Sequence, residues 1–265
     1  MIPEDFITPL LRLAEAAGAN TPLAIGVIAR MSAVAFLAPG LGERAVPMRV
    51  RLAAVLAMTT LVAPTLVDAG APQTASPAVL ASIIGAETAA GFIIGFSMRL
   101  AVFILQMTGT IAAQHLSMSM LFGPGIGHDQ ESPLSTIFIM AGLAIAAAGG
   151  LHIEIAASLI RSYQLFPFGE MPLAEDAAEW AARGGGEAIS IAFTLAAPFV
   201  VLGFVYTIAL AAMSRAMPQL MAAFVGAPAI IFAGMVLIAG TASVIVTHWA
   251  GILGAIIVDP IGGMR

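Results

Sequence analysis

The chain has 265 residues, of which 60% are hydrophobic and only 9% are charged, and its mean hydropathy is +1.02. Soluble globular domains carry charge on roughly a quarter of their residues, so the composition excludes that class and predicts a membrane-associated protein. The net charge of −5, without any clustered basic run, argues against nucleic acid as a partner, and the absence of cysteine excludes disulfides and thiolate metal sites.

Long apolar stretches predict helices as the only regular structure. A stretch of roughly 18 or more mostly apolar residues is long enough to cross the ~30 Å hydrocarbon layer as a helix. The alternation of polar and apolar residues that marks an outer-membrane barrel is absent. The sequence therefore predicts an all-α, hydrophobic multi-helix membrane-associated protein with about six long apolar helices.

The first residues of the chain predict a short amphipathic helix that lies at an interface. Pro3, Glu4 and Asp5 suit a first helical turn, because proline is pre-organised there and acids complement the helix dipole. Those acids stand where a secretion signal carries positive charge, so we expect no signal peptide here.

Two apolar segments, residues 23–41 and 52–67, predict the first two long helices. A Pro-Gly-Leu-Gly turn at residues 39–42 ends the first of them. The linker at residues 68–77 is rich in Pro, Gly, Ser and Thr and holds no arginine. It is therefore expected on the side of the membrane opposite to the basic turn between the two helices.

That basic turn predicts the orientation of the chain. Arg44, Arg49 and Arg51 form the densest positive charge in the sequence, which favours a cytoplasmic loop. Six spans with the amino terminus outside place these arginines and Arg215 on the cytoplasmic side.

Two further apolar segments, residues 78–108 and 134–160, predict the third and fourth helices. Gly91 and Gly95, four residues apart, favour close packing against another helix. Residues 162–187 then turn polar and acidic and end in three consecutive glycines, which predicts a surface loop or a domain boundary.

The last part of the chain, residues 188–259, predicts two long helices around a break at residues 213–219. The second would run for about 38 residues, far beyond one perpendicular crossing. It is expected to tilt, to break near Pro228, or to leave the hydrocarbon.

Six charged residues lie within apolar segments: Arg30, Glu87, Arg99, Glu154, Arg161 and Arg215. An ionised group in hydrocarbon costs several kcal/mol unless it is paired or wetted. We expect ion pairs between helices, or helices that are not in lipid. Alternatively, Glu87 or Glu154 is a proton-coupling carboxylate of a transporter.

Enzymatic motifs are missing from the sequence, so a non-enzymatic protein without cofactors is expected. No HExxH motif or Gly-x-Ser-x-Gly elbow occurs. His152 and Glu154 are two residues apart and point about 200° apart on a helix, so they cannot share one metal site. Asp129 comes one residue too late to match the GxGD motif of membrane aspartyl proteases.

A series of short motifs, in order along nearly the whole chain, resembles the FliR family of flagellar protein-export components, whose counterparts in virulence-type secretion form the SctT family. The motif near the carboxyl end, Ser214-Arg215-Ala-Met-Pro218-Gln219 followed by Phe224-Val225-Gly226-Ala-Pro228, is the most specific of them. The others are Arg30, Pro39-Gly-Leu-Gly, Val46-Pro47-Met-Arg49-Val-Arg51, Glu87-x-x-x-Gly91-x-x-x-Gly95-Phe96, Gly109 to Gln114, and Ser162-Tyr163 with Pro167-Phe-Gly169.

The chain departs from the family pattern at three positions. Thr207 and Met221 stand where the family usually has asparagine, and Ile230 stands where a basic residue is common. The chain therefore resembles a divergent member, and polar contacts around residues 207–230 are not carried over.

The resemblance implies a core subunit of the flagellar type III export gate, in the inner membrane within the basal body. Implied partners are FliP, FliQ, FlhB, FlhA and the rod-base component FliE, together with membrane lipid and the unfolded flagellar subunits that pass through. It also implies a FliP-like portion, residues 1–186, and a FliQ-like helical hairpin, residues 187–265. Candidate helix-packing or ion-pair positions are Arg30, Glu87, Gly91, Gly95, Arg99, Arg215, Pro218 and Gln219.

The polar stretch at residues 106–133, between the third and fourth helices, is assigned by the resemblance to a loop that helps to close the channel. A seal that reopens for varied polypeptides needs a mobile backbone and deformable apolar side chains, and it blocks ions by dewetting. The candidate plug residues are Met118, Met120, Leu121, Phe122, Gly123, Gly125 and Gly127. Within the stretch, residues 109–114 are expected to pack as helix and residues 128–133 to form a polar return.

Two alternatives stay open. The stretch at residues 106–133 is otherwise an ordinary hydrophilic connection between helices. The whole protein is otherwise an ion-coupled small-molecule permease that uses Glu87 or Glu154 in a site at the membrane midplane.

Overall fold

The computed structural model describes residues 21–43, 45–66, 76–116, 132–216 and 222–263, without the side chains of residues 222–225. Every regular element in these ranges is a helix, which confirms the predicted all-α class. In chain order they are α2 (Thr21–Leu37), α3 (Met48–Val62), the 3₁₀ turn η1 (Ala63–Leu66), α4 (Pro77–His115), α6 (Pro133–Ala148), α7 (Leu151–Leu165), α8 (Ala174–Ala216) and α9 (Ala222–Val258).

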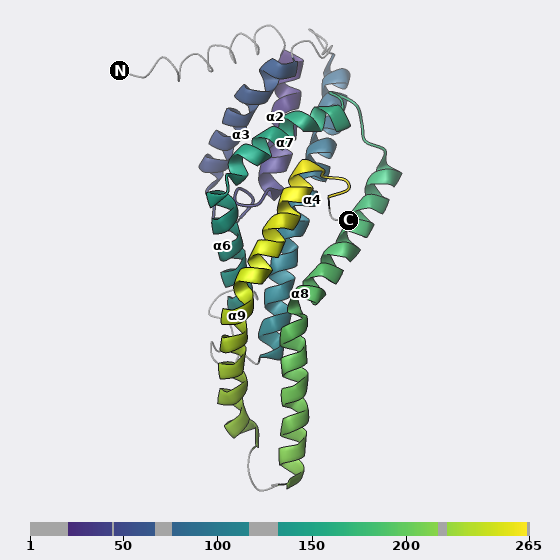
Figure 1. Ribbon diagram of the computed structural model, residues 1–265. Coiled ribbons are helices and arrows are strands. Elements are labelled where there is room, and N and C mark those ends of the chain that lie inside the picture. The colour runs from purple at the N-terminus through teal and green to yellow at the C-terminus, as the bar shows by residue number, and fades with distance from the viewer. Residues whose placement is uncertain (1–20, 44, 67–75, 117–131, 217–221, 264–265) are drawn as a thin grey trace, which may run out of the picture.

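Helix α4 is the centre of the bundle, and α2, α6, α8 and α9 all pack against it (Figure 1). It begins with Pro77 in the first turn and a cap from Ser76, whose Oγ accepts a hydrogen bond from the Val79 N–H at 3.4 Å. The helix continues seven residues beyond the predicted end at residue 108, to His115. Ala112 and Ala113 are buried in this extra length, so packing extends the helix where the sequence shows a polar stretch.

Small residues allow α2 and α4 to approach each other closely. A Cβ on Gly91 would lie 2.5 Å from the backbone oxygen of Arg30, and a Cβ on Gly95 would lie 3.2 Å from Cα of Val34. No side chain fits at either place without moving α2. The glycine pair therefore sets the distance between the two helices.

The single helix predicted for residues 134–160 is wrong, because the chain bends there. Helix α6 ends at Ala148, α7 begins at Leu151, and the bend between them is 76°. Gly150 has φ +86°, a left-handed conformation that residues with a Cβ rarely adopt. The Gly149-Gly150 pair thus turns α7 across α2 and α4, as Figure 1 shows.

The loop predicted for residues 162–187 is also wrong over most of its length, since α7 continues to Leu165 and α8 starts at Ala174. Alanines favour helix here, Glu175 and Asp176 occupy the first turn, and Glu179 lies 3.6 Å from Arg183 one turn later. The three glycines continue the helix and do not end it. Gly184 begins a buried stripe that faces the bundle: Gly184, Ala188, Ala192, Ala196, Phe199 and Gly203.

The two long helices near the carboxyl end run through prolines without ending. Pro198 lies inside α8, and Pro228 lies inside α9. The predicted break at residues 213–219 agrees with the end of α8 at Ala216, and α9 spans 37 residues. Helix α9 is therefore as long as the sequence predicts, and it does not break at Pro228.

Helices α8 and α9 continue past the end of α4 as an isolated pair (Figure 1). Their apolar side chains there face outward: Phe204 is 66% exposed and Phe232 is 71% exposed. Trp249 instead anchors the upper part of α9, since its Nε1 donates a hydrogen bond to the Ala101 carbonyl of α4 at 2.6 Å. The hairpin is thus fixed at one end and uncovered at the other.

Among the described residues, four helices are long and apolar enough to cross a membrane: Met48–Leu66, Pro77–His115, Ala174–Ala216 and Gly226–Val258. The bent pair α6 and α7 makes a fifth if it counts as one span. This supports the membrane class, and the orientation of the chain stays a prediction.

Candidate functional site

A fully buried ion pair lies where α2, α4 and α7 meet. Arg30 of α2 and Glu87 of α4 are both 0% exposed, and Nε of Arg30 lies 2.8 Å from Oε2 of Glu87. A second contact joins the same two side chains, because Nη2 of Arg30 donates to Oε1 of Glu87 at 3.1 Å. The guanidinium and the carboxylate therefore meet through two atoms each.

The end of α7 and the connector that follows it, residues 166–173, supply the remaining partners. Arg30 donates to Ser162 Oγ at 3.2 Å and to the Phe166 carbonyl at 2.9 Å. Glu87 accepts from the Tyr163 hydroxyl at 3.2 Å and from the Gly169 N–H at 2.8 Å.

The aromatic face of Tyr163 completes the enclosure. Its ring centroid lies 3.7 Å from Cζ of Arg30, which adds a cation–π contact to a fully buried guanidinium. Both oxygens of Glu87 accept hydrogen bonds and both terminal nitrogens of Arg30 donate them, whereas Nε of Arg30 meets Glu87 as an ion pair without a hydrogen bond. Such satisfaction is what makes a buried ion pair tolerable, since the desolvation cost otherwise exceeds the attraction.

This cluster of side chains fixes α2, α4 and α7 relative to one another in the described conformation. It links two helices that cross at Gly91 and Gly95 to a third helix and to the connector. Both oxygens of Glu87 already accept hydrogen bonds from donors of the protein, so the carboxylate does not face an open solute site. The arrangement can hold helices in register, and it offers no reactive group to a substrate.

The other charged candidates do not join this cluster. Arg99 of α4 donates to Glu43 at 2.7 Å, and both side chains are about one quarter exposed. Glu154, Arg161 and Arg215 are exposed. The structure therefore brings together Arg30, Glu87, Gly91 and Gly95, places Arg99 in a separate pair, and leaves the rest apart.

The two ends of segment 117–131 are anchored on the bundle although the segment itself lies outside the described residues. His115 contacts α8 at Gly203, where an added Cβ would lie 2.9 Å from Cβ of His115. Leu116 is fully buried against α9, and a Cβ on Gly234 would lie 2.8 Å from its methyl carbons. The chain therefore leaves α4 between the two long helices.

The returning end of the segment is fixed on α4 as well. Ser132 caps α6, since its Oγ accepts from the Ser135 N–H at 3.1 Å. Gly109 of α4 lies against the backbone of Ser135, where an added Cβ would clash. Residues 109–114, expected to pack as helix, lie within α4.

Several predicted site residues fall outside the described residues. They are the seven candidate plug residues, namely Met118, Met120, Leu121, Phe122, Gly123, Gly125 and Gly127, and also Pro218 and Gln219. The expected interfacial helix within residues 1–20 and the departure at Met221 are also outside this range.

Two of the three departures from the family pattern lie within the described residues, and neither shows a hydrogen bond to another helix. Thr207 donates its hydroxyl proton to the Gly203 carbonyl of its own helix at 2.8 Å. Ile230 is buried, so an apolar side chain packs where the family commonly has a basic one.

The sequence did not reveal which residues would complete the ion pair. Ser162, Tyr163 and Gly169 belonged to a recognised motif but had no assigned role, and Phe166 contributes only a backbone oxygen. Glycine at position 169 has φ +76°, which brings its N–H to Glu87. The presence of this motif in the same series of family motifs as Arg30 and Glu87 was the only available signal.

Comparison with known proteins gives a consistent result. The family described as "Bacterial export proteins, family 1" matches residues 22–256. The flagellar biosynthetic protein FliR of Caulobacter vibrioides is 30% identical over 84% of this chain and 89% of its own length. FliR of Escherichia coli is 26% identical over 79% of this chain and 80% of its own length.

A relative from a virulence-type system matches a shorter region. The Yop proteins translocation protein T of Yersinia pestis is 27% identical over 52% of this chain and 54% of its own length. Similarity thus extends to both flagellar and virulence-type export proteins, with the longer matches on the flagellar side.

Proposed function

This chain belongs to family 1 of the bacterial export proteins and is a component of type III export apparatus, and from that premise we propose that it is a core, non-enzymatic subunit of the flagellar export gate. In this role it joins FliP and FliQ in the inner membrane, at the basal body, around the path of unfolded flagellar subunits. FlhB, FlhA and FliE are further proposed contacts.

The uncovered apolar surface of α8 and α9 is the observation that carries this proposal. The two helices span 43 and 37 residues, whereas about 20 residues cross the hydrocarbon. Only 28% and 22% of their most apolar windows are buried within the chain. Apolar surface of this length exceeds what one lipid crossing covers, so partner subunits are its natural cover.

The proposed division into two parts separates most of the long α8 and α9 pair from the other helices. The FliQ-like unit, residues 187–265, corresponds to most of the α8 and α9 pair, and residues 1–186 to the remaining helices. The boundary between residues 186 and 187 lies inside continuous helix α8, so the two parts share one rigid element.

The anchors of segment 117–131 support the proposed plug. The chain leaves between α8 and α9 at the level where these helices continue without α4, and it returns on the α6 side. A segment fixed at both ends there can reach a channel bounded by the long helices. Its methionines, Leu121 and Phe122 supply deformable apolar contact, and its glycines supply backbone freedom.

The permease alternative gains no support from its two carboxylates. Glu87 is enclosed by Arg30, Tyr163 and the Gly169 N–H, and Glu154 is exposed in the first turn of α7. Neither carboxylate lines either of the two cavities beside α4 and the start of α8.

Deletion of residues 118–127 tests the plug. The assembled gate is expected to conduct ions at a rate at least about tenfold higher once the seal is removed. Planar-bilayer conductance measures this effect, and recovery of FliP and FliQ with the variant verifies that assembly is intact. An intact complex with unchanged conductance contradicts the plug.

Single cysteines test the assembly, because the native chain has none. Cysteines at Ser119 and Gly125 are expected to crosslink to FliP. A chain that purifies as an autonomous monomer and binds a small solute would instead support the permease.

A further inference from the structure

An apolar groove runs between α4, the connector at residues 166–173 and the start of α8. Two adjoining cavities of about 310 and 570 Å³ form it, and they share Ile93, Met171, Pro172 and Ala177. The groove is on the opposite end of the bundle from the exposed tip of the α8 and α9 pair (Figure 1). It includes the first turns of α8, and it is therefore distant from that tip and from the anchors of segment 117–131 at His115 and Leu116.

The floor and walls of the groove are apolar and partly uncovered. Gly85 and Ala89 leave space along α4, and no atom lies within 4 Å of a Cβ added at Gly85. Met171 is 68% exposed and Leu173 is 72% exposed. Side chains of this size at such exposure are typical of contact surfaces.

Aromatic rings form a continuous line beside the groove. Phe92 stacks on Phe96 with ring centroids 6.0 Å apart, and Phe96 meets Trp180 edge to face at the same separation. Aromatic side chains supply large contact area with few rotatable bonds, which favours binding.

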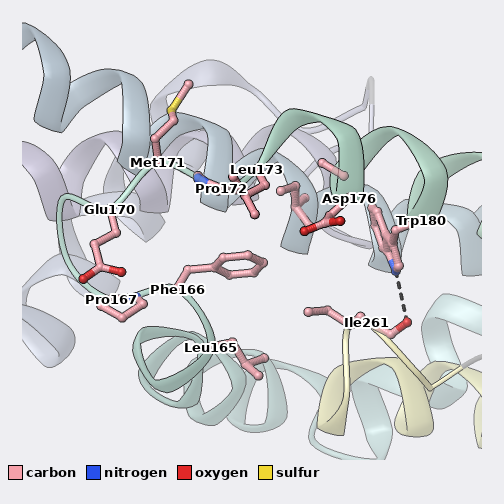
Figure 2. A pocket seen from close by; sticks show the side chains of 12 residues that line it. Leu165, Phe166, Pro167, Glu170, Met171, Pro172, Leu173, Asp176, Trp180 and Ile261 are labelled. Carbon is pink, nitrogen blue, oxygen red and sulfur yellow. Dashed lines mark hydrogen bonds between the residues drawn. The ribbon is translucent and has the colours of Figure 1, made fainter.

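Carboxylates line the groove. Figure 2 shows Glu170 on one side of the Phe166 ring and Asp176 on the other. Glu175 and Glu179 lie close by on α8 and are exposed. Between residues 162 and 187 the chain has five acids and a single arginine, Arg183, and that arginine lies 3.6 Å from Glu179.

Both sides of the groove are held in place before anything binds. Arg30 holds the Phe166 carbonyl and Glu87 holds the Gly169 N–H, so the buried ion pair fixes the connector. Trp180 donates from Nε1 to the Ile261 carbonyl at 3.1 Å, and Asp259 accepts from the Ile261 N–H at 3.1 Å. A preformed site binds with less loss of conformational entropy.

We propose that this groove binds a basic, amphipathic segment of a partner protein, with apolar side chains in the groove and Lys or Arg side chains at Glu170 and Asp176. Charge decides between a protein segment and lipid. The phosphate of a phospholipid would meet carboxylates of the same sign, and ionised acids are costly next to acyl chains. A cationic protein segment satisfies both the apolar floor and the acidic rim.

Designed peptides test the proposal on the full-length protein in detergent. The probe is a synthetic fluorescent helix with leucines on one face and lysines on the other, and its twin carries glutamates in place of the lysines. Fluorescence anisotropy is expected to show binding of the lysine peptide at least about tenfold tighter than that of its twin. Equal affinities would overturn the proposal.

Charge reversal tests whether Glu170 and Asp176 contact the lysines of the peptide. The double variant Glu170→Lys/Asp176→Lys is expected to weaken the lysine peptide about tenfold, since two attractive contacts become repulsive. Glu154→Lys, an exposed acid on α7 outside the groove, is the matched control and is expected to bind as the native chain does. An unchanged affinity in the double variant, with the native melting temperature, overturns the assignment.

Cysteine protection locates the peptide and tests lipid as the occupant. Gly85→Cys lies in the groove, and Gly240→Cys is an equally open position on α9. The lysine peptide is expected to slow maleimide labelling at position 85 and not at position 240. Equal protection of position 85 by phosphatidylglycerol nanodiscs without peptide would assign the groove to lipid and overturn the proposal.

Discussion

The ion-pair junction and the distal hairpin use apolar sequence in opposite ways. The ion-pair junction, where α2, α4 and α7 meet around Arg30 and Glu87, buries its apolar side chains and even its charges inside one chain. The distal hairpin, residues 204–216 of α8 and 222–233 of α9, exposes side chains as large as Phe204 and Phe232.

This difference separates what stabilises the monomer from what serves assembly. Burial of apolar surface contributes about 25 cal/mol per Å², so the junction contributes to folding of the isolated chain. Exposed apolar side chains of the hairpin contribute little until lipid or another subunit covers them. We therefore expect mutations in the two regions to affect different measurements.

Glu87→Ala gives the largest expected effect, because it leaves the Arg30 guanidinium buried without its carboxylate. The free energy of unfolding is expected to fall by about 3–5 kcal/mol. Thermal unfolding in detergent micelles, followed by circular dichroism, measures the change. The double variant Arg30→Met/Glu87→Leu removes both charges and is expected to recover most of the loss; a double variant as unstable as Glu87→Ala would show that the charges themselves are required.

Gly91→Ala comes next, because its Cβ would lie 2.5 Å from the Arg30 backbone oxygen and α2 must move. The expected loss is about 1–3 kcal/mol. Gly85→Ala, six residues earlier in the same helix and with open space at Cβ, is the matched control. That control is expected to be neutral or to gain up to about 1 kcal/mol, and an equal loss in both variants would remove the close helix approach as the cause.

Phe204→Ser with Phe232→Ser gives the smallest expected change in the melting temperature. Each side chain is at least 66% exposed, so the isolated chain is expected to change by less than about 0.5 kcal/mol per site. Recovery of FliP and FliQ in pull-downs is expected to drop, since the proposed cover of this surface is lost. A large fall in the stability of the isolated chain, with partner recovery unchanged, would contradict the division between the two regions.

Helix type and approximate position followed from the sequence, since apolar runs of sufficient length have few alternatives. Two predictions about glycine-rich stretches were wrong for the same reason. Glycines at residues 149–150 break a helix that was predicted to continue, whereas glycines at residues 184–186 continue one that was predicted to end. Gly150 has a left-handed backbone, and Gly184 is buried within α8, so tertiary surroundings decided whether glycine ended or continued the helix.

The candidate site, too, was predictable from the sequence only in part. Arg30 and Glu87 stood out because charges are rare in apolar segments. Their mutual pairing and the roles of Tyr163 and Gly169 required three distant segments to meet, which no local pattern encodes. The groove beside the connector depends in turn on that same meeting.

The sequence by itself determined the membrane class, the helical architecture and the export family, because composition, run length and ordered motifs depend on local chemistry. Only the tertiary structure decided which charges pair, which glycines permit close packing and which apolar faces stay uncovered. Those properties depend on distances between segments far apart in the chain, and such distances are set by packing.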